Sequence, residues 1–135
     1  MKQYVYFQPN DKDFKDEVGD CAIRAVCKAF NMDWLTAFDS LCKYARMNQC
    51  LPNQEKATKP FLQDAGWHYT TAGRGKRITV ADLAKTFASY DGPMIAHVRV
   101  GYRTHLVTIQ AGKYYDTWDC GNKLIFGYWS QEEDV

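Results

Sequence analysis

Cys21 is the residue whose surroundings best fit nucleophilic chemistry. It stands in the stretch GDCAIRAV, directly after Gly19 and Asp20 and at the start of a run with helical spacing. A helix N-terminus carries partial positive charge and unpaired N–H groups, which lower the pKa of a thiol and can hold the oxyanion formed when a carbonyl is attacked. An isolated free cysteine is a packing residue by default. The helix-start position instead predicts that Cys21 is a nucleophile.

A cysteine nucleophile needs a base, and the base needs an orienting partner. His105 opens the run HLVTIQ, and Asp116 lies in the next run, KYYDTW. A two-residue hairpin turn at 111–112 would make His105 and Asp116 diagonal neighbours on one face, with Asp119 on the other face. We therefore predict that Asp116, rather than Asp119, orients His105.

Helices are predicted from apolar spacing and from residues typical of helix ends. Asp20 is expected to cap the first helix, because its side chain readily accepts hydrogen bonds from first-turn N–H groups. Pro60 is expected to open a short helix that Gly66 closes, and Thr79 to cap the last one. The predicted helices cover about residues 20–30, 33–47, 60–66 and 79–90.

Short runs rich in β-branched and aromatic residues follow the helices and are separated by turns that contain glycine. They predict strands at 94–100, 105–110, 113–118 and 123–129, with a further short strand within 1–8. Helices first and an antiparallel meander second predict an α+β fold, with N-terminal helices packed on a C-terminal antiparallel sheet. No repeat or linker interrupts the chain, so residues 1–135 are predicted to form a single domain.

The two motifs together resemble the papain-like cysteine peptidases in their compact bacterial and viral forms. In that superfamily a Cys begins the central helix, a His begins a strand, and an Asp or Asn follows on the neighbouring strand. The resemblance implies a papain-like fold over essentially the whole chain, with Cys21 as nucleophile, His105 as base and Asp116 as orienting residue. The chain is also similar to small proteins of phages and their bacterial hosts, which implies a phage or prophage origin.

Three positions depart from the papain-like pattern. Papain-like enzymes often carry a Gln six residues before the nucleophile to complete the oxyanion hole, and Lys15 stands there in this chain. Gln8 or Asn10 could reach the same place if the intervening polar loop folds back. The aromatic residue that follows the nucleophile in papain is Ala22 here. Asp20, beside the thiol, would raise the thiol pKa if it were unpaired.

The remaining cysteines are predicted to be structural. Cys27, Cys42 and Cys50 are expected to pack, and Cys120 to lie in a loop. None of the five cysteines forms a C-x-x-C pair, so neither a disulfide framework nor a zinc knuckle is indicated. We expect free thiols, and neither a metal nor an organic cofactor.

His97 is the competing base, but no acid follows it at hairpin spacing, so we expect a hydrogen-bonded strand histidine.

Three aromatic residues near the predicted site could either pack in the core or line a substrate groove; these are Trp118, Tyr128 and Trp129.

Charge and hydropathy give no reason to expect nucleic acid or a membrane as partner. The net charge is +1, with acidic and basic residues interspersed, and the one basic cluster, GRGKR at 73–77, is expected to be a solvated loop. No stretch approaches the about 20 apolar residues of a membrane span, and the first residues lack a signal-peptide run. We therefore expect a cytoplasmic location.

The expected function is a cysteine hydrolase that cleaves a peptide or isopeptide bond of a peptide or protein substrate through a thioester. A transamidase or other acyltransferase would use the same triad, with an amine in place of water. An alternative of another class is a phage-encoded module that binds a host protein and whose triad is vestigial. The pH dependence of Cys21 labelling by iodoacetamide discriminates an activated nucleophile from an inert one.

Overall fold

The computed structural model describes residues 2–131, which form helices in the first part of the chain and most of a sheet in the second. The helices are η1 (Lys15–Glu17), α1 (Cys21–Phe30), α2 (Trp34–Asn48), α3 (Glu55–Asp64) and α4 (Val80–Thr86). The strands are β1 (Tyr4–Tyr6), β2 (His68–Thr71), β3 (Met94–Val100), β4 (Arg103–Gln110), β5 (Lys113–Asp116) and β6 (Ile125–Ser130). The predicted α+β class is confirmed.

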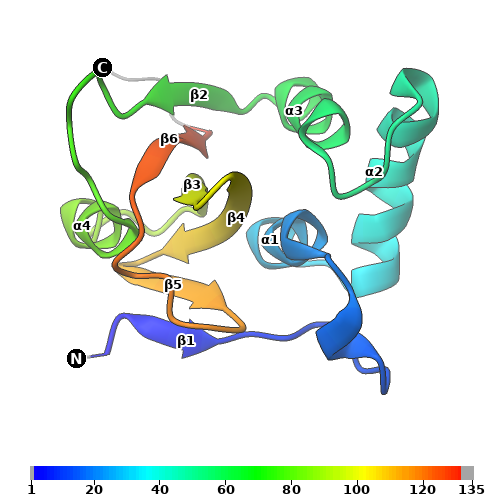
Figure 1. Cartoon of the computed structure of the whole chain (residues 1–135), viewed down its shortest axis with the longest axis horizontal. Coiled ribbons are helices and arrows are strands. Elements are labelled where there is room, and N and C mark those ends of the chain that lie inside the picture. The colour runs from blue at the N-terminus through cyan, green and yellow to red at the C-terminus, as the bar shows by residue number, and fades with distance from the viewer. Residues whose placement is uncertain (1, 132–135) are drawn as a thin grey trace.

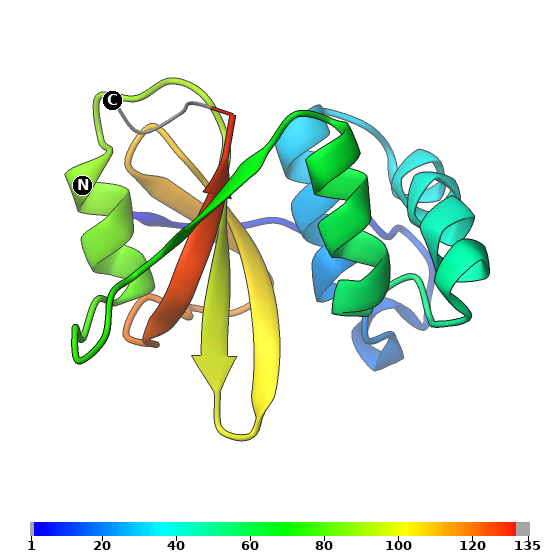
Figure 2. The same cartoon turned by 90° about the horizontal axis from the view of Figure 1, so that it is seen from above.

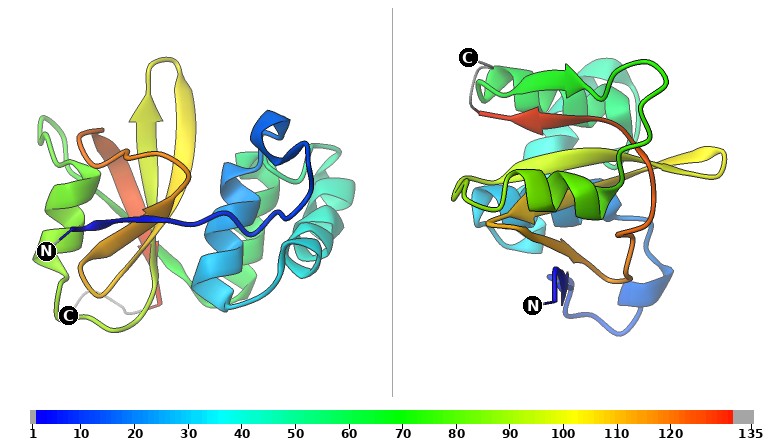
Figure 3. Two further views of the ribbon diagram at one scale, coloured as in Figure 1. Left: turned by 90° about the horizontal axis from the view of Figure 1, so that it is seen from below. Right: turned by 90° about the vertical axis from the view of Figure 1, so that its left-hand side faces the viewer.

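All six strands belong to one mixed sheet, in the order β1-β5-β4-β3-β6-β2. The prediction of an antiparallel sheet is wrong at one edge, where β1 runs parallel to β5 and Tyr4 pairs with Tyr114. Parallel neighbours need a long crossover connection, and here α1 to α4 and three further strands, β2, β3 and β4, lie between β1 and β5. Figure 3 shows the N-terminal segment running along this edge from β1 toward the helices.

Helices cover both faces of the sheet, with α4 on one face and α1, α2 and α3 on the other (Figures 1 and 2). Strand β3 shows how the sequence fits this arrangement. Met94, Ala96 and Val98 belong to the cluster that contains α4, whereas Ile95 packs with residues of α1 and α3. Because alternate residues of a strand face opposite sides, a continuous apolar run serves both cores.

Helix α1 begins at Cys21, as predicted, but the predicted side-chain cap is wrong. The Asp20 carboxylate makes no capping hydrogen bond. It accepts instead from Arg24 and from the indole N–H of Trp34. The free N–H of Ala22 donates to the Asn53 side chain, whose Oδ1 lies 2.7 Å away. A residue from the loop before α3 thus caps α1.

Helix α3 begins at Glu55, earlier than the predicted start at Pro60, which lies inside the helix. Pro60 has no N–H to donate to the carbonyl one turn before it. That carbonyl, on Lys56, accepts a 3.1 Å hydrogen bond from the Asn48 side chain of α2. The replacement donor explains how the helix continues through a proline. The predicted closing residue, Gly66, follows with a φ of 87°.

The hairpin between β4 and β5 has the predicted register, in which Gln110 pairs with Lys113 across a two-residue turn. Both turn residues have positive φ, 51° for Ala111 and 81° for Gly112. This is the backbone of a type I′ turn, whose twist matches that of the strands. The hairpin fixes which residues of β5 can reach His105.

The predicted cap of α4 is confirmed, since Thr79 and Asp82 form a reciprocal capping box. Strand β2 was not predicted, because its residues HYTT are mostly exposed and show no apolar alternation. Within residues 2–131, no helix combines the length and hydrophobicity that crossing a bilayer requires.

Candidate active site

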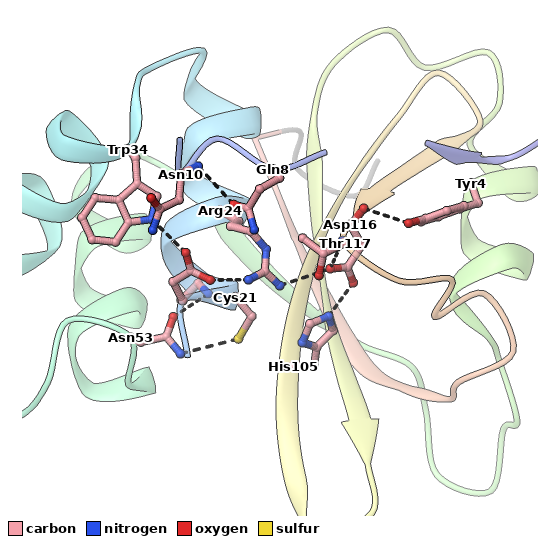
Figure 4. A network of polar contacts seen from close by, with 12 residues as sticks. Tyr4, Gln8, Asn10, Cys21, Arg24, Trp34, Asn53, His105, Asp116 and Thr117 are labelled. Carbon is pink, nitrogen blue, oxygen red and sulfur yellow. Dashed lines mark hydrogen bonds and ion pairs between the residues drawn. The ribbon is translucent and has the colours of Figure 1, made fainter. Parts of the chain in front are cut away.

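The structure brings together Cys21, His105 and Asp116, the three residues singled out in the sequence. Cys21 opens α1, and its partly exposed thiol lies between the side chains of Asn53 and His105 (Figure 4). The Asn53 amide donates to the sulfur from 3.6 Å. His105 and the backbone N–H of Leu106 also act on the thiol, and both favour its charged form.

His105 lies on β4 and only 9% of its surface is exposed. Its Nε2 is 2.5 Å from Oδ2 of Asp116. An ionised carboxylate only accepts hydrogen bonds, so this contact places a proton on Nε2 and leaves Nδ1 for the thiol. The Trp118 ring packs on the imidazole, with 5.2 Å between centroids. The ring is therefore held on two sides.

Asp116 ends β5 and is 2% exposed. The oxygen that does not face His105 accepts from the N–H of Thr117 at 2.8 Å and from the Arg24 guanidinium at 3.2 Å. Asp119 does not contact His105; it accepts from the Tyr114 hydroxyl and from the N–H of Gly121. The diagonal geometry of the hairpin separates the two acids in this way.

Arg24 links Asp116 to a second buried acid, Asp20. Asp20 is fully buried, and its other oxygen accepts from the Trp34 indole at 2.9 Å. The sequence raised the case of an unpaired carboxylate beside the thiol. In the structure this carboxylate is paired, because Arg24 lies one helical turn after it on α1. Buried charges need such partners.

The polar contacts set the ionisation of the three residues. Burial opposes the charged form of Cys21, but the hydrogen bond and charge of His105, with the N–H groups of Leu106 and Asn53, lower its pKa below the ordinary thiol value. Burial likewise opposes charge on His105, but hydrogen bonds to Asp116, Cys120 and Cys21 raise its pKa to about 11. Opposite charge stabilises both partners. The site thus favours the charged forms of both Cys21 and His105.

The pKa of Asp116 is held below its ordinary value, although burial acts in the opposite direction. The hydrogen bond and charge of His105 contribute most to the lowering, followed by the N–H of Thr117 and the charge of Arg24. Asp116 therefore stays ionised at neutral pH, which keeps His105 in one tautomer and one orientation.

Cys120 is a second thiol beside His105. It lies in the loop after β5, as predicted, but it is fully buried in the core cluster under α4. Burial raises its pKa, and the charge of Asp116 adds to that effect, although a hydrogen bond from His105 opposes it. All five cysteines are free thiols.

His105, Asp116 and Cys120 are also the one group of three or more close metal-binding side chains found among residues 2–131, with their ligand atoms within 4.8 Å of one another. These atoms already bond to each other, and the positive charge of Arg24 contacts the same carboxylate. The residues fit a hydrogen-bonded triad better than a cation site, because a metal ion would have to displace both contacts.

His97 differs from His105 in its partner. Its Nδ1 lies 3.0 Å from the Tyr69 hydroxyl, and burial lowers its pKa although the charge of Glu55 opposes this. It forms a hydrogen bond with a neutral hydroxyl rather than with a carboxylate, so it has the features of the expected hydrogen-bonded strand histidine.

Of the two residues predicted to complete an oxyanion hole, one lines the cleft and the other is buried. Gln8 lines the cleft beside Cys21, and its Oε1 accepts from the N–H of Asn10. Asn10 is buried and accepts from the N–H of Lys12. The amide that contacts the thiol belongs to Asn53, which the sequence analysis missed. No local pattern marks it, since it lies in an irregular loop whose position depends on the packing of α2 against α3.

Two pockets meet at Cys21. One lies between the 15–20 loop and the β3–β4 hairpin, which projects beyond the other strands (Figure 3), and has a volume of about 450 Å³. The other lies between α3 and the sheet. Trp118 lines the first and Trp129 the second, whereas Tyr128 packs on Phe87 in the core. The sequence left open whether these three aromatic residues line a groove, and two of them do.

The site is thus a cysteine of lowered pKa at a helix start in an open cleft, with a histidine of raised pKa and a buried carboxylate in line behind it. In comparisons with known proteins, no family model, no curated protein and no solved structure matches the chain.

Proposed function

We propose that this protein is a cysteine hydrolase, related to the papain-like peptidases, that cleaves a peptide or isopeptide bond in a peptide or protein substrate. The observation that carries the proposal is the contact chain from Cys21 through His105 to Asp116, with the thiol at a helix N-terminus. Nucleophile, base and orienting acid are the three parts that acyl transfer needs.

In the first step, the Cys21 thiolate attacks the substrate carbonyl carbon and a C–S bond forms. The carbonyl oxygen becomes an oxyanion. His105 then gives its Nδ1 proton to the leaving nitrogen, the C–N bond breaks, and a thioester remains on Cys21. In the second step, His105 takes a proton from water, the resulting hydroxide attacks the thioester carbon, the C–S bond breaks, and the carboxylic acid leaves the Cys21 thiolate beside the protonated His105.

Asn53 supports the proposal as a donor to the oxyanion. Its Oδ1 is fixed by the N–H of Ala22, so its Nδ2 points at the sulfur that carries the reacting carbon. The backbone N–H of Cys21 is a first-turn group without an intrahelical acceptor and can be the second donor. In this proposal Asn53 takes the role for which the sequence suggested Gln8 or Asn10.

The relation to papain-like peptidases is supported by the arrangement of the elements. A helix that starts with the cysteine packs against strands that carry the histidine and the acid, with the helices before most of the sheet in the chain. A cytoplasmic location and a phage or prophage origin belong to the same proposal and rest on the sequence alone.

The proposal is tested by exposing a library of peptides of diverse sequence to the wild-type protein and to Cys21→Ala. New N-termini should form only with the wild type, and intact mass spectrometry should find an acyl adduct on Cys21 at early times. Absence of both would refute the proposal. Added amines that end up in the product would identify an acyltransferase rather than a hydrolase.

The binding-module alternative has one specific observation in its favour. Tyr102, at the tip of the projecting β3–β4 hairpin, is completely exposed and is therefore accessible to a partner protein. The binding-module alternative predicts that Cys21→Ala leaves the biological effect of the protein unchanged, while Tyr102→Ala removes that effect. The hydrolase predicts loss of the effect with Cys21→Ala.

A further inference from the structure

The two pockets that meet at Cys21 differ in their walls. Thr104 and Asn53 belong to both, but His105 and Trp118 line only the pocket beside the β3–β4 hairpin. Of these two pockets, the one under α3 alone is lined by Leu106, Thr58 and Trp129. His105 and Leu106 are consecutive on β4, so their side chains leave the strand on opposite faces. One strand therefore separates the two pockets.

We propose that the pocket under α3 binds the side chain of the substrate residue that supplies the acyl group, and that it selects a small side chain. The proposal rests on the proposed hydrolase function and names its substrate class, a peptide with Gly, Ala or Ser before the scissile bond. The leaving amine then lies in the pocket beside the hairpin.

The chemistry of the leaving group determines the direction in which the substrate lies across Cys21. The leaving nitrogen must receive its proton from the imidazole, so it has to lie on the side of Cys21 where His105 is. That side is the hairpin pocket. The acyl residue lies on the other side of the reacting carbon, and the pocket under α3 is the space available there.

The size of the pocket sets the selection. Its volume is about 60 Å³. A cavity of about 10–15 Å³ is enough to hold one water molecule, whereas a cavity of about 150 Å³ accepts benzene. The pocket therefore holds a methyl or hydroxymethyl group and excludes an aromatic ring.

The walls resist enlargement. Thr58 and Trp129 are 3% and 7% exposed. The hydroxyl of Thr58 is tied to the carbonyl of Gln54 at 3.1 Å, and the Trp129 ring packs edge-on against Tyr69. Leu106, partly buried on β4, can be shortened without removing a hydrogen bond or a ring contact. The fixed walls make size selection a property of the folded chain.

The groove continues past the small pocket. A pocket of about 650 Å³ shares Glu55, Lys59, His97 and Trp129 with it and extends toward β2. Its width suits larger residues that precede the acyl residue in the substrate. Glu55 and Lys59 carry opposite charges, so size rather than charge is the discriminating property at the small pocket.

Two chloromethyl ketone peptides that differ only in ending with Ala or with Phe test the proposal. In each, the Cys21 thiolate displaces chloride and forms a thioether, so labelling needs the nucleophile and the pocket but no turnover. Rate constants are read by intact mass spectrometry on the full chain. We expect the Ala probe to label at least about tenfold faster, the range that a few methylene groups contribute in a fitted pocket.

Leu106→Ala should reduce the Ala-to-Phe ratio severalfold, and Leu124→Ala, a change at a partly buried leucine outside both pockets, should leave it unchanged. A ratio near one in the wild type, or an unchanged ratio in Leu106→Ala, would overturn the proposal. Selective labelling without cleavage of any peptide would refute the hydrolase and leave the pocket standing. Cleavage of peptides with no size preference would refute the pocket assignment and leave the hydrolase proposal standing.

Discussion

Cys21 and Cys120 approach the same imidazole from two regions of the molecule, and their thiols differ in ionisation. Both make hydrogen bonds with His105, yet the pKa of Cys21 is lowered while burial raises that of Cys120. Cys21 faces the cleft from the start of a helix, whereas Cys120 is sealed in the core under α4.

The difference shows that a neighbouring histidine does not by itself activate a thiol. Cys21 also receives N–H groups from Asn53 and Leu106, which stabilise a negative sulfur. Cys120 instead faces the negative charge of Asp116, which opposes ionisation. N–H donors and exposure to the cleft therefore distinguish Cys21, the proposed nucleophile, from the packing residue Cys120.

The largest expected effect comes from removing each thiol in turn. Cys21→Ala should lower peptide hydrolysis by about 10⁴-fold or more, because the covalent route is lost. Cys120→Ala should keep activity within about tenfold, because the sulfur is removed from the core and not from the cleft. Initial rates on a peptide cleaved by the wild type measure both. Equal losses would mean that the two thiols act together.

The next effect concerns the acid behind His105. Asp116→Asn should lower turnover by about 10³–10⁴-fold, because an amide can hold the imidazole in the wrong tautomer. Asp119→Asn is the matched control, since an amide oxygen can still accept from Tyr114 and Gly121. It should lower turnover by less than about tenfold, with circular dichroism showing both variants folded. A larger loss for Asp119→Asn would show that Asp119, and not Asp116, orients His105.

The sequence predicts the parts of the site that follow from local rules. The turn at 111–112 sets the register of β4 and β5, and the register puts Asp116 beside His105. The apolar spacing after Asp20 places Cys21 at a helix start. Each of these inferences needs only a period of 2 or 3.6 and an end signal.

Contacts between distant segments could not be predicted in this way. Asn53 reaches the thiol only because α2 and α3 pack together and set the loop between them. The exact partners of Asp20 depend on Trp34, at the start of the next helix. The parallel pairing of β1 depends on a crossover that no local pattern encodes, and the burial of Cys120 on the closure of α4 over the sheet.

A smaller effect is expected from the amide that contacts only one of the two thiols. Asn53→Ala should lower kcat by about 10²–10³-fold, the usual result of removing one oxyanion donor. Asn48→Ala is the control, because Asn48 bonds backbone carbonyls of α2 and α3 and not the sulfur. An unchanged kcat in Asn53→Ala would leave the oxyanion role to other groups. A loss in Asn48→Ala of the same size would indicate a purely structural effect.

The smallest effect is the pH dependence of labelling by iodoacetamide. A thiol with an ordinary pKa of about 8.5 is only a few per cent thiolate at pH 7, so its labelling rate rises more than about tenfold by pH 8.5. The lowered pKa of Cys21 means that a larger share of this thiol is ionised at pH 7, so its labelling rate should rise less steeply over the same interval. The midpoint of the pH profile for Cys21 labelling should lie below the ordinary thiol pKa of about 8.5.

Cys42 is an internal control for this measurement, because burial and Asp39 raise its pKa and its rate should climb steeply. Cys120 should stay unlabelled until the chain unfolds. Peptide mass spectrometry after timed labelling separates the three cysteines. Parallel pH profiles for Cys21 and Cys42 would show that the site does not activate its thiol.

The long connection between the two halves of the site has a consequence for biosynthesis. Arg24 and Asp116 lie 92 residues apart, which at about 5–20 residues per second corresponds to about 5–18 seconds of translation. During that time the nascent chain carries Cys21 without the imidazole and N–H donor of β4 that favour its thiolate. The growing polypeptide is therefore chemically quiet toward other proteins at the ribosome, and its reactivity begins only when the last strands close the sheet.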